Sequence, residues 1–268
     1  MDKIFIYGIV FIFGTLIGSF LNVCIYRIPL QKSVATGRSH CMSCNKNIKW
    51  YDLIPVFSFI FLRAKCRHCK SKISIQYPLI EAINGLLYLT VFYVYGWEGP
   101  FIIILNIIYS IVVSTLIVLS VIDIRTQTIP NKLSVFLLIL GFLATLTKIF
   151  LAYYNNTSIK DVLLKHGIGF FAVSGLLLLI FYVTGGRGIG GGDVKLMAGA
   201  GLLLGWDIVI VAFLTACFLA TIIHLIKMIF KNADRVFAFG PYLSVGIIIG
   251  MLYGKDIISW YLATFLYM

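Results

Sequence analysis

The amino-acid sequence predicts an all-α polytopic membrane protein with about eight transmembrane helices and one small polar insert. Of its 268 residues, 60% are hydrophobic and only 12% are charged, whereas soluble domains are about 45–50% apolar. The mean hydropathy is +1.00. Most apolar stretches approach the length of about 20 residues that an α-helix needs to cross a bilayer. The chain is therefore expected to cross the membrane repeatedly as helices.

Eight apolar stretches define the predicted helices. The first is longer than the apolar core of a secretory signal, about 7–15 residues, and no cleavage site of small residues follows it, so we expect a retained helix. The sixth and the eighth are the weakest, because both are short and rich in glycine. In chain order the stretches are 4–26, 78–95, 101–122, 133–152, 167–184, 194–205, 208–226 and 241–253.

The predicted organisation has three parts: a first transmembrane helix at 1–26, a cytoplasmic insert at 27–77, and a transmembrane core at 78–268. If the connecting segments alternate sides, one side carries 17 of the 22 lysines and arginines. Positive residues favour cytoplasmic loops, so this side is predicted to be cytoplasmic, with both termini outside. The net charge of +12 then reflects topology and attraction to anionic membrane lipids, and no binding to nucleic acid is expected.

The insert contains two CxxC pairs, CMSC and CRHC. At this spacing, two short knuckles bring four thiolates around a tetrahedral zinc ion. Cytoplasmic thiols stay reduced, which favours structural zinc over the alternatives of a disulfide or a redox pair. About 50 residues bury too little core to fold alone, so the insert is expected to be zinc-stapled. His68 is expected to be a solvated neighbour. The predicted ligands are Cys41, Cys44, Cys66 and Cys69.

Solvated surface charge explains seven of the ten acidic residues, and three remain, Glu81, Asp123 and Asp193, within or at the edge of predicted helices. Inserting an acidic side chain into the bilayer costs about 2.5–3.5 kcal/mol, so each of the three is expected to have a structural or functional role. Asp123 ends the third helix and Asp193 begins the sixth, which places both at the cytoplasmic boundary. If the two carboxylates meet, they share a proton, and one serves as general base on water while the other serves as general acid toward a scissile carbonyl. Two unrelated helix-end acids are the alternative, because the helix dipole favours a carboxylate in a first turn.

The segment around Asp193, GGRGIGGGDVKLMAGAG, is rich in glycine. It contains a GxGxxG pattern, but a dinucleotide-binding loop follows a strand, whereas this segment follows a predicted membrane helix. It also lacks the Gly-Lys-Ser/Thr ending of a P-loop. A flexible linker does not explain why the glycines continue into the next apolar stretch. Small residues let helix backbones pack closely, and they let an extended peptide backbone reach the acid.

Five motifs, in order along nearly the whole chain, resemble those of the type IV leader peptidase family, the prepilin peptidases, which are GxGD aspartic membrane proteases. GSFLNVCIYRIP resembles the opening motif of that family. The cysteine pairs, with DLIPVFSF and ISIQYPLIEAINGLLY, resemble its cytoplasmic insert. DIRTQTIPN and GGGDVK match its two catalytic motifs, and FGPYL matches a later one.

The resemblance implies that Asp123 and Asp193 are the catalytic pair and that Gly190 and Gly192 are the glycines of GxGD, lining the path of the substrate. Residues 78–268 then contain the aspartic protease core. The implied enzyme is an endopeptidase of the bacterial plasma (inner) membrane. It removes the short basic leader of type IV prepilins and pseudopilins, as used in pilus assembly, protein secretion and competence, at the cytoplasmic face.

Many family members that carry the insert also N-methylate the new terminus with S-adenosylmethionine, and that cofactor is implied here by resemblance only. Glu81, close to the insert, is a candidate for its site, with helix pairing as the alternative. Lys195 is a candidate for orienting the substrate or Asp193, with an anchor at the cytoplasmic boundary as the alternative, and Arg125 has the same two interpretations. The oligomeric state is left open.

Two other classes of function remain as alternatives. A proton- or ion-coupled transporter would use the two membrane-edge aspartates as its path. A transporter of that kind is expected to show two halves with matching broken helices, and the sequence contains no internal repeat. A zinc-stapled membrane scaffold with incidental acids is the third interpretation.

Overall fold

The structure, a computed structural model, describes residues 2–230 and 238–265. Lys231, Asp234 and Arg235, which belong to a predicted cytoplasmic loop, lie outside these residues. Within the described part of the chain the regular structure is helical, and its β structure is limited to two isolated antiparallel bridges in the insert. The predicted all-α class is confirmed.

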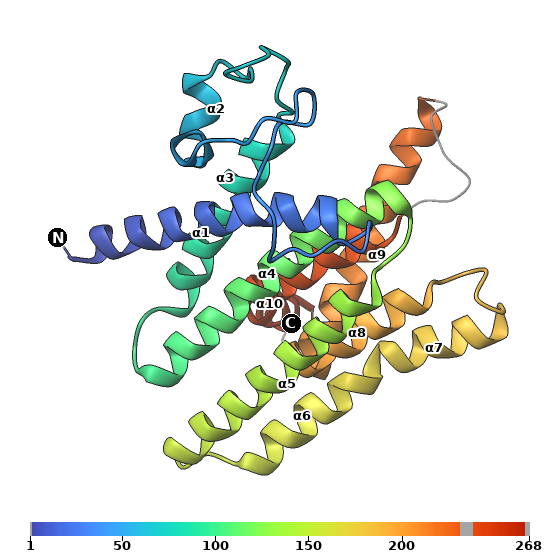
Figure 1. The fold of residues 1–268 in the computed structure, drawn as a ribbon. Helices are drawn as coiled ribbons and strands as arrows, with labels where there is room; N and C mark the ends of the chain where they lie inside the picture. The colour runs from blue at the N-terminus through green and yellow to red at the C-terminus, as the bar shows by residue number, and fades with distance from the viewer. Residues whose placement is uncertain (1, 231–237, 266–268) are drawn as a thin grey trace. The chain divides into compact units, whose positions relative to one another are not determined.

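The chain divides into two compact units, Met1–Gly96 and Trp97–Met268. In the first unit, the first and last helices pack on each other and the insert connects them (Figure 1). Gly18 lets the two backbones touch, because a Cβ added there would lie 2.7 Å from the Cα of Glu81. The helices of this unit are α1 (Asp2–Arg27), the 3-10 helix η1 (Trp50–Leu53), α2 (Phe57–Phe61) and α3 (Gln76–Tyr95).

The second unit is a helical bundle in which α8 packs against α5, α6, α7, α9 and α10 (Figure 1). Glycines let the helices approach, since a Cβ added to Gly141 of α5 would lie 2.6 Å from the carbonyl oxygen of Gly199 of α8. The glycines inside this apolar stretch thus serve close packing, as predicted. The helices are α4 (Pro100–Thr126), α5 (Asn131–Tyr154), α6 (Ile159–Ala172), α7 (Ser174–Val183), α8 (Gly191–Leu204), α9 (Trp206–Ile229) and α10 (Gly240–Phe265).

Seven helices of the described chain are long and apolar enough to cross a membrane, close to the predicted number of about eight. The sixth predicted stretch forms α8, which has only 14 residues. At 1.5 Å per residue it measures about 21 Å, whereas the hydrocarbon core of a bilayer is about 30 Å thick. Helices α6 and α7 together make one of the seven, Ile159–Val183, and α10 continues beyond the eighth predicted stretch as far as Phe265.

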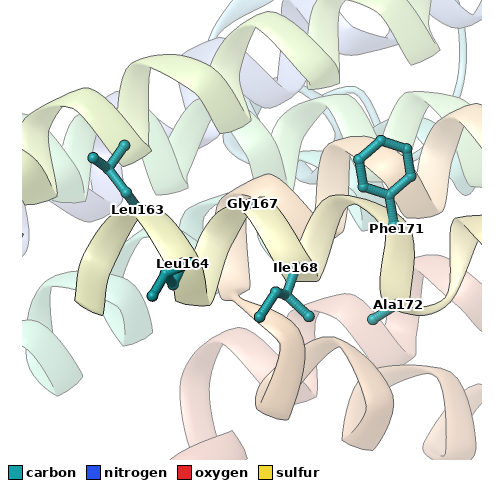
Figure 2. Close-up of a pocket in the computed structure, with 6 residues that line it drawn as sticks. All are labelled: Leu163, Leu164, Gly167, Ile168, Phe171 and Ala172. Atoms are coloured by element: carbon teal, nitrogen blue, oxygen red, sulfur yellow. The ribbon is translucent and has the colours of Figure 1, made fainter. Parts of the chain in front are cut away.

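The outer surface of α6 carries an open groove without any charged side chain (Figure 2). The groove is open at Gly167, because a Cβ added there would have no neighbouring atom within 4 Å. An apolar surface of this kind on a membrane-crossing helix is suited to lipid and holds no group that could carry out acid–base chemistry. Its lining residues are Leu163, Leu164, Gly167, Ile168, Phe171 and Ala172.

Candidate active site and metal centre

Asp123 occupies the last turn of α4 and is only 4% exposed. The helix ends three residues later, where Gln127 adopts a left-handed conformation with φ of 52°. The backbone N–H of Gly240, the first residue of α10, donates a hydrogen bond of 2.9 Å to Oδ2 of Asp123. A helix N-terminus is favourable for a carboxylate, because its first amides are free to donate. Asp123 is therefore held from a helix that lies more than a hundred residues away in the sequence.

Asp193 lies in the first turn of α8 and is 8% exposed. Its Oδ1 atom is buried and has no hydrogen-bond partner among the described residues. Its backbone N–H donates to the carbonyl oxygen of Gly190 at 3.1 Å, which folds the glycine segment into the start of the helix. Buried polar atoms are almost always paired in folded proteins. A carboxylate oxygen left over in this way is available to a reactant.

The segment that follows Asp123 contacts the turn that carries Asp193. The side chain of Ile129 packs against Gly192, where an added Cβ would lie 2.7 Å from the Ile129 Cβ. Lys195 Nζ donates to Asn131 Oδ1 at 2.9 Å. The two carboxylates also interact electrostatically. The structure thus brings together the two acids that the sequence placed at the same boundary.

The glycines and the lysine predicted beside Asp193 have defined positions. Gly190 borders the acid, since a Cβ added there would lie 3.3 Å from Asp193 Oδ2. Gly192 has no space for a side chain, because Ile129 covers it. Lys195 is engaged with Asn131, which its sequence position alone did not predict. Two buried carboxylates, one held by an amide and one with a free oxygen, can divide the roles of base and acid.

Gly240 was not among the residues predicted for the site. The FGPYL motif, at 239–243, was the available signal, but it gave no indication of which atom acts. In the structure the atom is a backbone amide, and a Cβ added to Gly240 would lie 2.7 Å from Asp123 Oδ2. Only glycine allows the helix terminus to approach the carboxylate so closely.

The four cysteines of the insert form one cluster, with all four Sγ atoms within 4.8 Å of one another. The thiols are free, and no disulfide joins them. Zinc–sulfur bonds of about 2.3 Å in a tetrahedron place sulfur atoms about 3.8 Å apart, and the Sγ atoms of Cys41 and Cys69 are 3.8 Å apart. The donor set and its spacing therefore fit a zinc ion. His68 is not part of the cluster.

The two CxxC knuckles have the same backbone structure. Cys41 and Cys66 each accept, on their carbonyl oxygen, the N–H of the residue four positions later, at 2.8 Å from Asn45 and 3.0 Å from Lys70. Asn45 and Lys70 are left-handed, with φ of 54° and 59°. Hydrogen bonds from the backbone of the first knuckle lower the pKa of Cys41 to about 6, which favours the thiolate that binds metal.

Glu81 lies in α3 and is 7% exposed. Its Oε2 atom accepts a 2.7 Å hydrogen bond from the backbone N–H of Val56, just before α2. Val56 has a φ of 62°, a strained conformation for a β-branched residue, which this hydrogen bond helps to hold. Glu81 therefore ties the insert to α3.

Glu81 also lines a cavity of about 400 Å³ within the first unit. The cavity is bounded by the end of α1, the knuckles and the start of α3. Asn22 orders one wall, because its side-chain amide lies 3.3 Å from the carbonyl oxygen of Tyr77 and its Oδ1 accepts from Gln76 at 3.3 Å. Arg27 and Cys41 also line the cavity. It combines a buried carboxylate with a cation and apolar walls, which suits a small polar ligand.

Comparisons with known proteins cover nearly the whole chain. The model of the Bacterial Peptidase A24 N-terminal domain matches residues 12–95, and that of the Type IV leader peptidase family matches residues 110–225. A prepilin leader peptidase/N-methyltransferase of Pectobacterium carotovorum subsp. carotovorum is 32% identical over 92% of each chain. Proteins of the same name are 32% identical in Bacillus subtilis (strain 168), over 95% of this chain and 97% of the relative, and 29% identical in Aeromonas hydrophila, over 97% and 95%. No solved structure matches the chain.

The two matched regions contain the residues of the metal cluster and of the candidate active site. The cysteine cluster and Glu81 fall in the first matched region, and Asp123 and Asp193 fall in the second. The transporter and scaffold interpretations receive no support from these relatives. The chain is a multi-pass membrane protease and belongs to the type IV leader peptidase family.

Proposed function

We propose that this protein is an aspartic endopeptidase that removes the leader peptide of type IV prepilin-like precursors at the cytoplasmic face of the bacterial plasma membrane. The observation that carries the proposal is the buried, unpartnered Oδ1 of Asp193 beside a second buried acid, Asp123. The relatives are named for activity on prepilins. The distribution of lysine and arginine supports a cytoplasmic site, because both acids lie at the end of the bundle that joins the basic segments.

The two acids divide the proton transfers of hydrolysis. The amide of Gly240 donates to Asp123, and such donation favours a charged carboxylate, so we assign Asp123 as the base. Asp123 takes a proton from water as the water oxygen attacks the scissile carbonyl carbon. Asp193 gives its proton to the carbonyl oxygen, which forms a tetrahedral diol. The carbon–nitrogen bond then breaks, the leaving amine takes a proton from Asp123, and Asp193 recovers its proton from the diol hydroxyl.

The glycine segment before α8 provides the path for the substrate. Gly190, the residue before α8, carries no side chain, so an extended peptide backbone can lie next to Asp193 there, whereas Gly192 is covered by Ile129 and lets the first turn of α8 pack closely. Lys195, fixed by Asn131 one turn into α8, is proposed to orient the peptide from the side of the helix. A short basic leader would remain among the anionic lipid headgroups on the same side of the membrane.

Single substitutions of the two acids test the proposal. Asp123→Asn and Asp193→Asn are each expected to abolish cleavage of a purified prepilin, measured as loss of the leader by mass spectrometry, while the protein remains in the membrane. Asp161→Asn is the matched control, because this acid is exposed in the first turn of α6. Normal cleavage by either dyad variant would refute the assignment.

We also propose that the protein N-methylates the new terminus, as the names of its relatives indicate for them. The cavity of about 400 Å³ beside Glu81 has the size and mixed polarity that fit S-adenosylmethionine. When bound, this cofactor supplies an electrophilic methyl group. Glu81 and Arg27 would hold its charged groups of opposite sign, and the wall around Asn22 would position its polar edge.

Glu81→Gln separates the two activities. The amide oxygen of glutamine can still accept the N–H of Val56, so the insert keeps its anchor, but the negative charge is lost. The variant is expected to cleave prepilin normally and to lose the 14-dalton methyl gain on the product, and to bind S-adenosylhomocysteine more weakly in calorimetry. Unchanged binding and methylation would remove Glu81 from the cofactor site.

A further inference from the structure

The carbonyl end of α8, opposite the end that carries Asp193, is covered by polar side chains from two neighbouring helices. The Thr145 hydroxyl lies 2.7 Å from the carbonyl oxygen of Leu202 and 2.9 Å from that of Gly141 in its own helix, so its one hydrogen is shared between them. Lys148 Nζ donates to the carbonyl oxygen of Leu203 at 2.7 Å, and both side chains come from α5. Nδ1 of His166, on α6, lies 2.7 Å from the same Leu202 oxygen. His166 is only 4% exposed. Three side chains thus supply donors to two adjacent carbonyls of one helix turn.

These donors pair with carbonyl groups that an α-helix leaves without partners at its C-terminal end. The last four carbonyls of an α-helix have no partner within the helix, and unpaired backbone groups in an apolar surrounding cost several kcal/mol each. The carbonyl end also carries a partial negative charge, which a lysine side chain complements. Gly205, with φ of 87°, ends α8 and returns its N–H to the carbonyl oxygen of Gly201. Lys165 packs along Gly205 and forms a salt bridge of 2.7 Å with Asp207.

Helix α8 is therefore fixed to α5 at both ends. Near its start, Lys195 bonds to Asn131, the first residue of α5. Near its finish, Leu203 bonds to Lys148, seventeen positions further along α5. The two helices run in the same direction, with Gly141 and Gly199 in close contact between these points. A helix held in this way cannot slide or rotate without breaking polar contacts at the far end.

We propose that Thr145, Lys148 and His166 are positioning residues of the protease: by holding the carbonyl end of α8, they set the depth and rotation at which Asp193 meets Asp123. This inference rests on the proposed role of the two aspartates. Lys148 is the central member, because its Nζ donates to the Leu203 carbonyl oxygen and lies 5.8 Å from the centroid of the Tyr109 ring.

The test compares Lys148→Met with Lys148→Arg, which keeps N–H donors at this position, and with Thr147→Val as control. The hydroxyl of Thr147 bonds to the carbonyl oxygen of Leu143 within α5, so its loss leaves α8 untouched. Because a displacement of about 1 Å at a reacting group can cost about a hundredfold in rate, Lys148→Met is expected to lower kcat about 10- to 100-fold with little change in KM. Lys148→Arg is expected to recover most of that loss.

A second measurement reports the position of α8 without using activity. Ile129→Cys and Gly192→Cys, at positions whose Cβ atoms would lie 2.7 Å apart, are joined by mild oxidation in zinc-loaded protein whose Cys24 and Cys217 are replaced by alanine. This pair leaves the contact between Asn131 and Lys195 intact. Lys148→Met is expected to lower the bridging yield several-fold, and Thr147→Val is expected to leave it unchanged. Equal yields in the two variants would overturn the positioning role. If Asp193→Asn cleaves normally while the yield still falls in Lys148→Met, the proposed protease roles fail and the coupling along α8 stands.

Discussion

Gly240→Ala gives a sensitive test of the contact that holds Asp123. A Cβ at this position would lie 2.7 Å from Asp123 Oδ2, whereas ordinary van der Waals contacts begin at 3.4 Å, so the carboxylate or the start of α10 must move by about 0.7 Å. The same movement lengthens the 2.9 Å hydrogen bond from the Gly240 amide. Hydrogen bonds to charged groups are worth about 1.5–3 kcal/mol. At about 1.4 kcal/mol for each factor of ten, kcat is expected to fall about 10- to 100-fold.

The assay is the steady-state cleavage of a prepilin by purified protein in lipid, with melting temperature measured in parallel. Gly175→Ala is the control, because a Cβ at that position in α7 would have no neighbour within 4 Å. The control should keep full activity. The reasoning is wrong if Gly240→Ala cleaves at the wild-type rate, or if its loss of rate merely follows a loss of folded protein.

Two further predictions concern the insert. The double substitution Cys41→Ser and Cys66→Ser should remove one bound zinc per chain, measured by elemental analysis, and should make the insert sensitive to protease. Cys217→Ala is the control and should retain the metal. A wild-type protein without zinc would contradict the zinc assignment. The Arg67 guanidinium lies 2.6 Å from Asp52, and its hydrogen bonds hold the pKa of that carboxyl below its usual value. This stabilisation is present above the ordinary pKa of the carboxyl and is lost as the pH falls through the lowered pKa of the folded state. Asp52→Asn should therefore lower the stability at pH 7 by about 0.2–1 kcal/mol, seen as a slightly lower melting temperature, and the difference should shrink below about pH 4 and disappear below the pKa of the folded state. A difference that persists where the carboxyl is protonated would exclude the ion pair as its cause.

The fold class was predictable because apolar length and composition determine whether a segment enters a membrane. The number of membrane-spanning helices was harder to predict, because local hydropathy does not distinguish a short helix buried in protein, such as α8, from a helix that crosses lipid. The pairing of Asp123 and Asp193 was predictable as a hypothesis, because alternation of the loops places them at the same depth. Their separation and orientation depend on how α4 and α8 pack, which local patterns do not encode.

Other parts of the site depend on tertiary contacts that leave no local signal. The amide of Gly240 is a backbone group, so no residue type identifies it as a partner of Asp123. Lys148 and Lys165 lie in or beside apolar segments with no motif around them, and only the packed structure gives each a specific partner. The spacing of the cysteines was informative because a knuckle is built from neighbouring residues, and its geometry follows from a few positions in the chain.

The length of α8 also bears on how a hydrolase inside a bilayer obtains its second substrate. A helix of about 21 Å leaves roughly 9 Å of a normal hydrocarbon layer unspanned. Because α8 packs against α5, α6, α7, α9 and α10, protein rather than lipid fills the space beyond its ends. Water, the reagent that peptide-bond hydrolysis consumes, therefore has to reach Asp193 between protein helices and not through lipid.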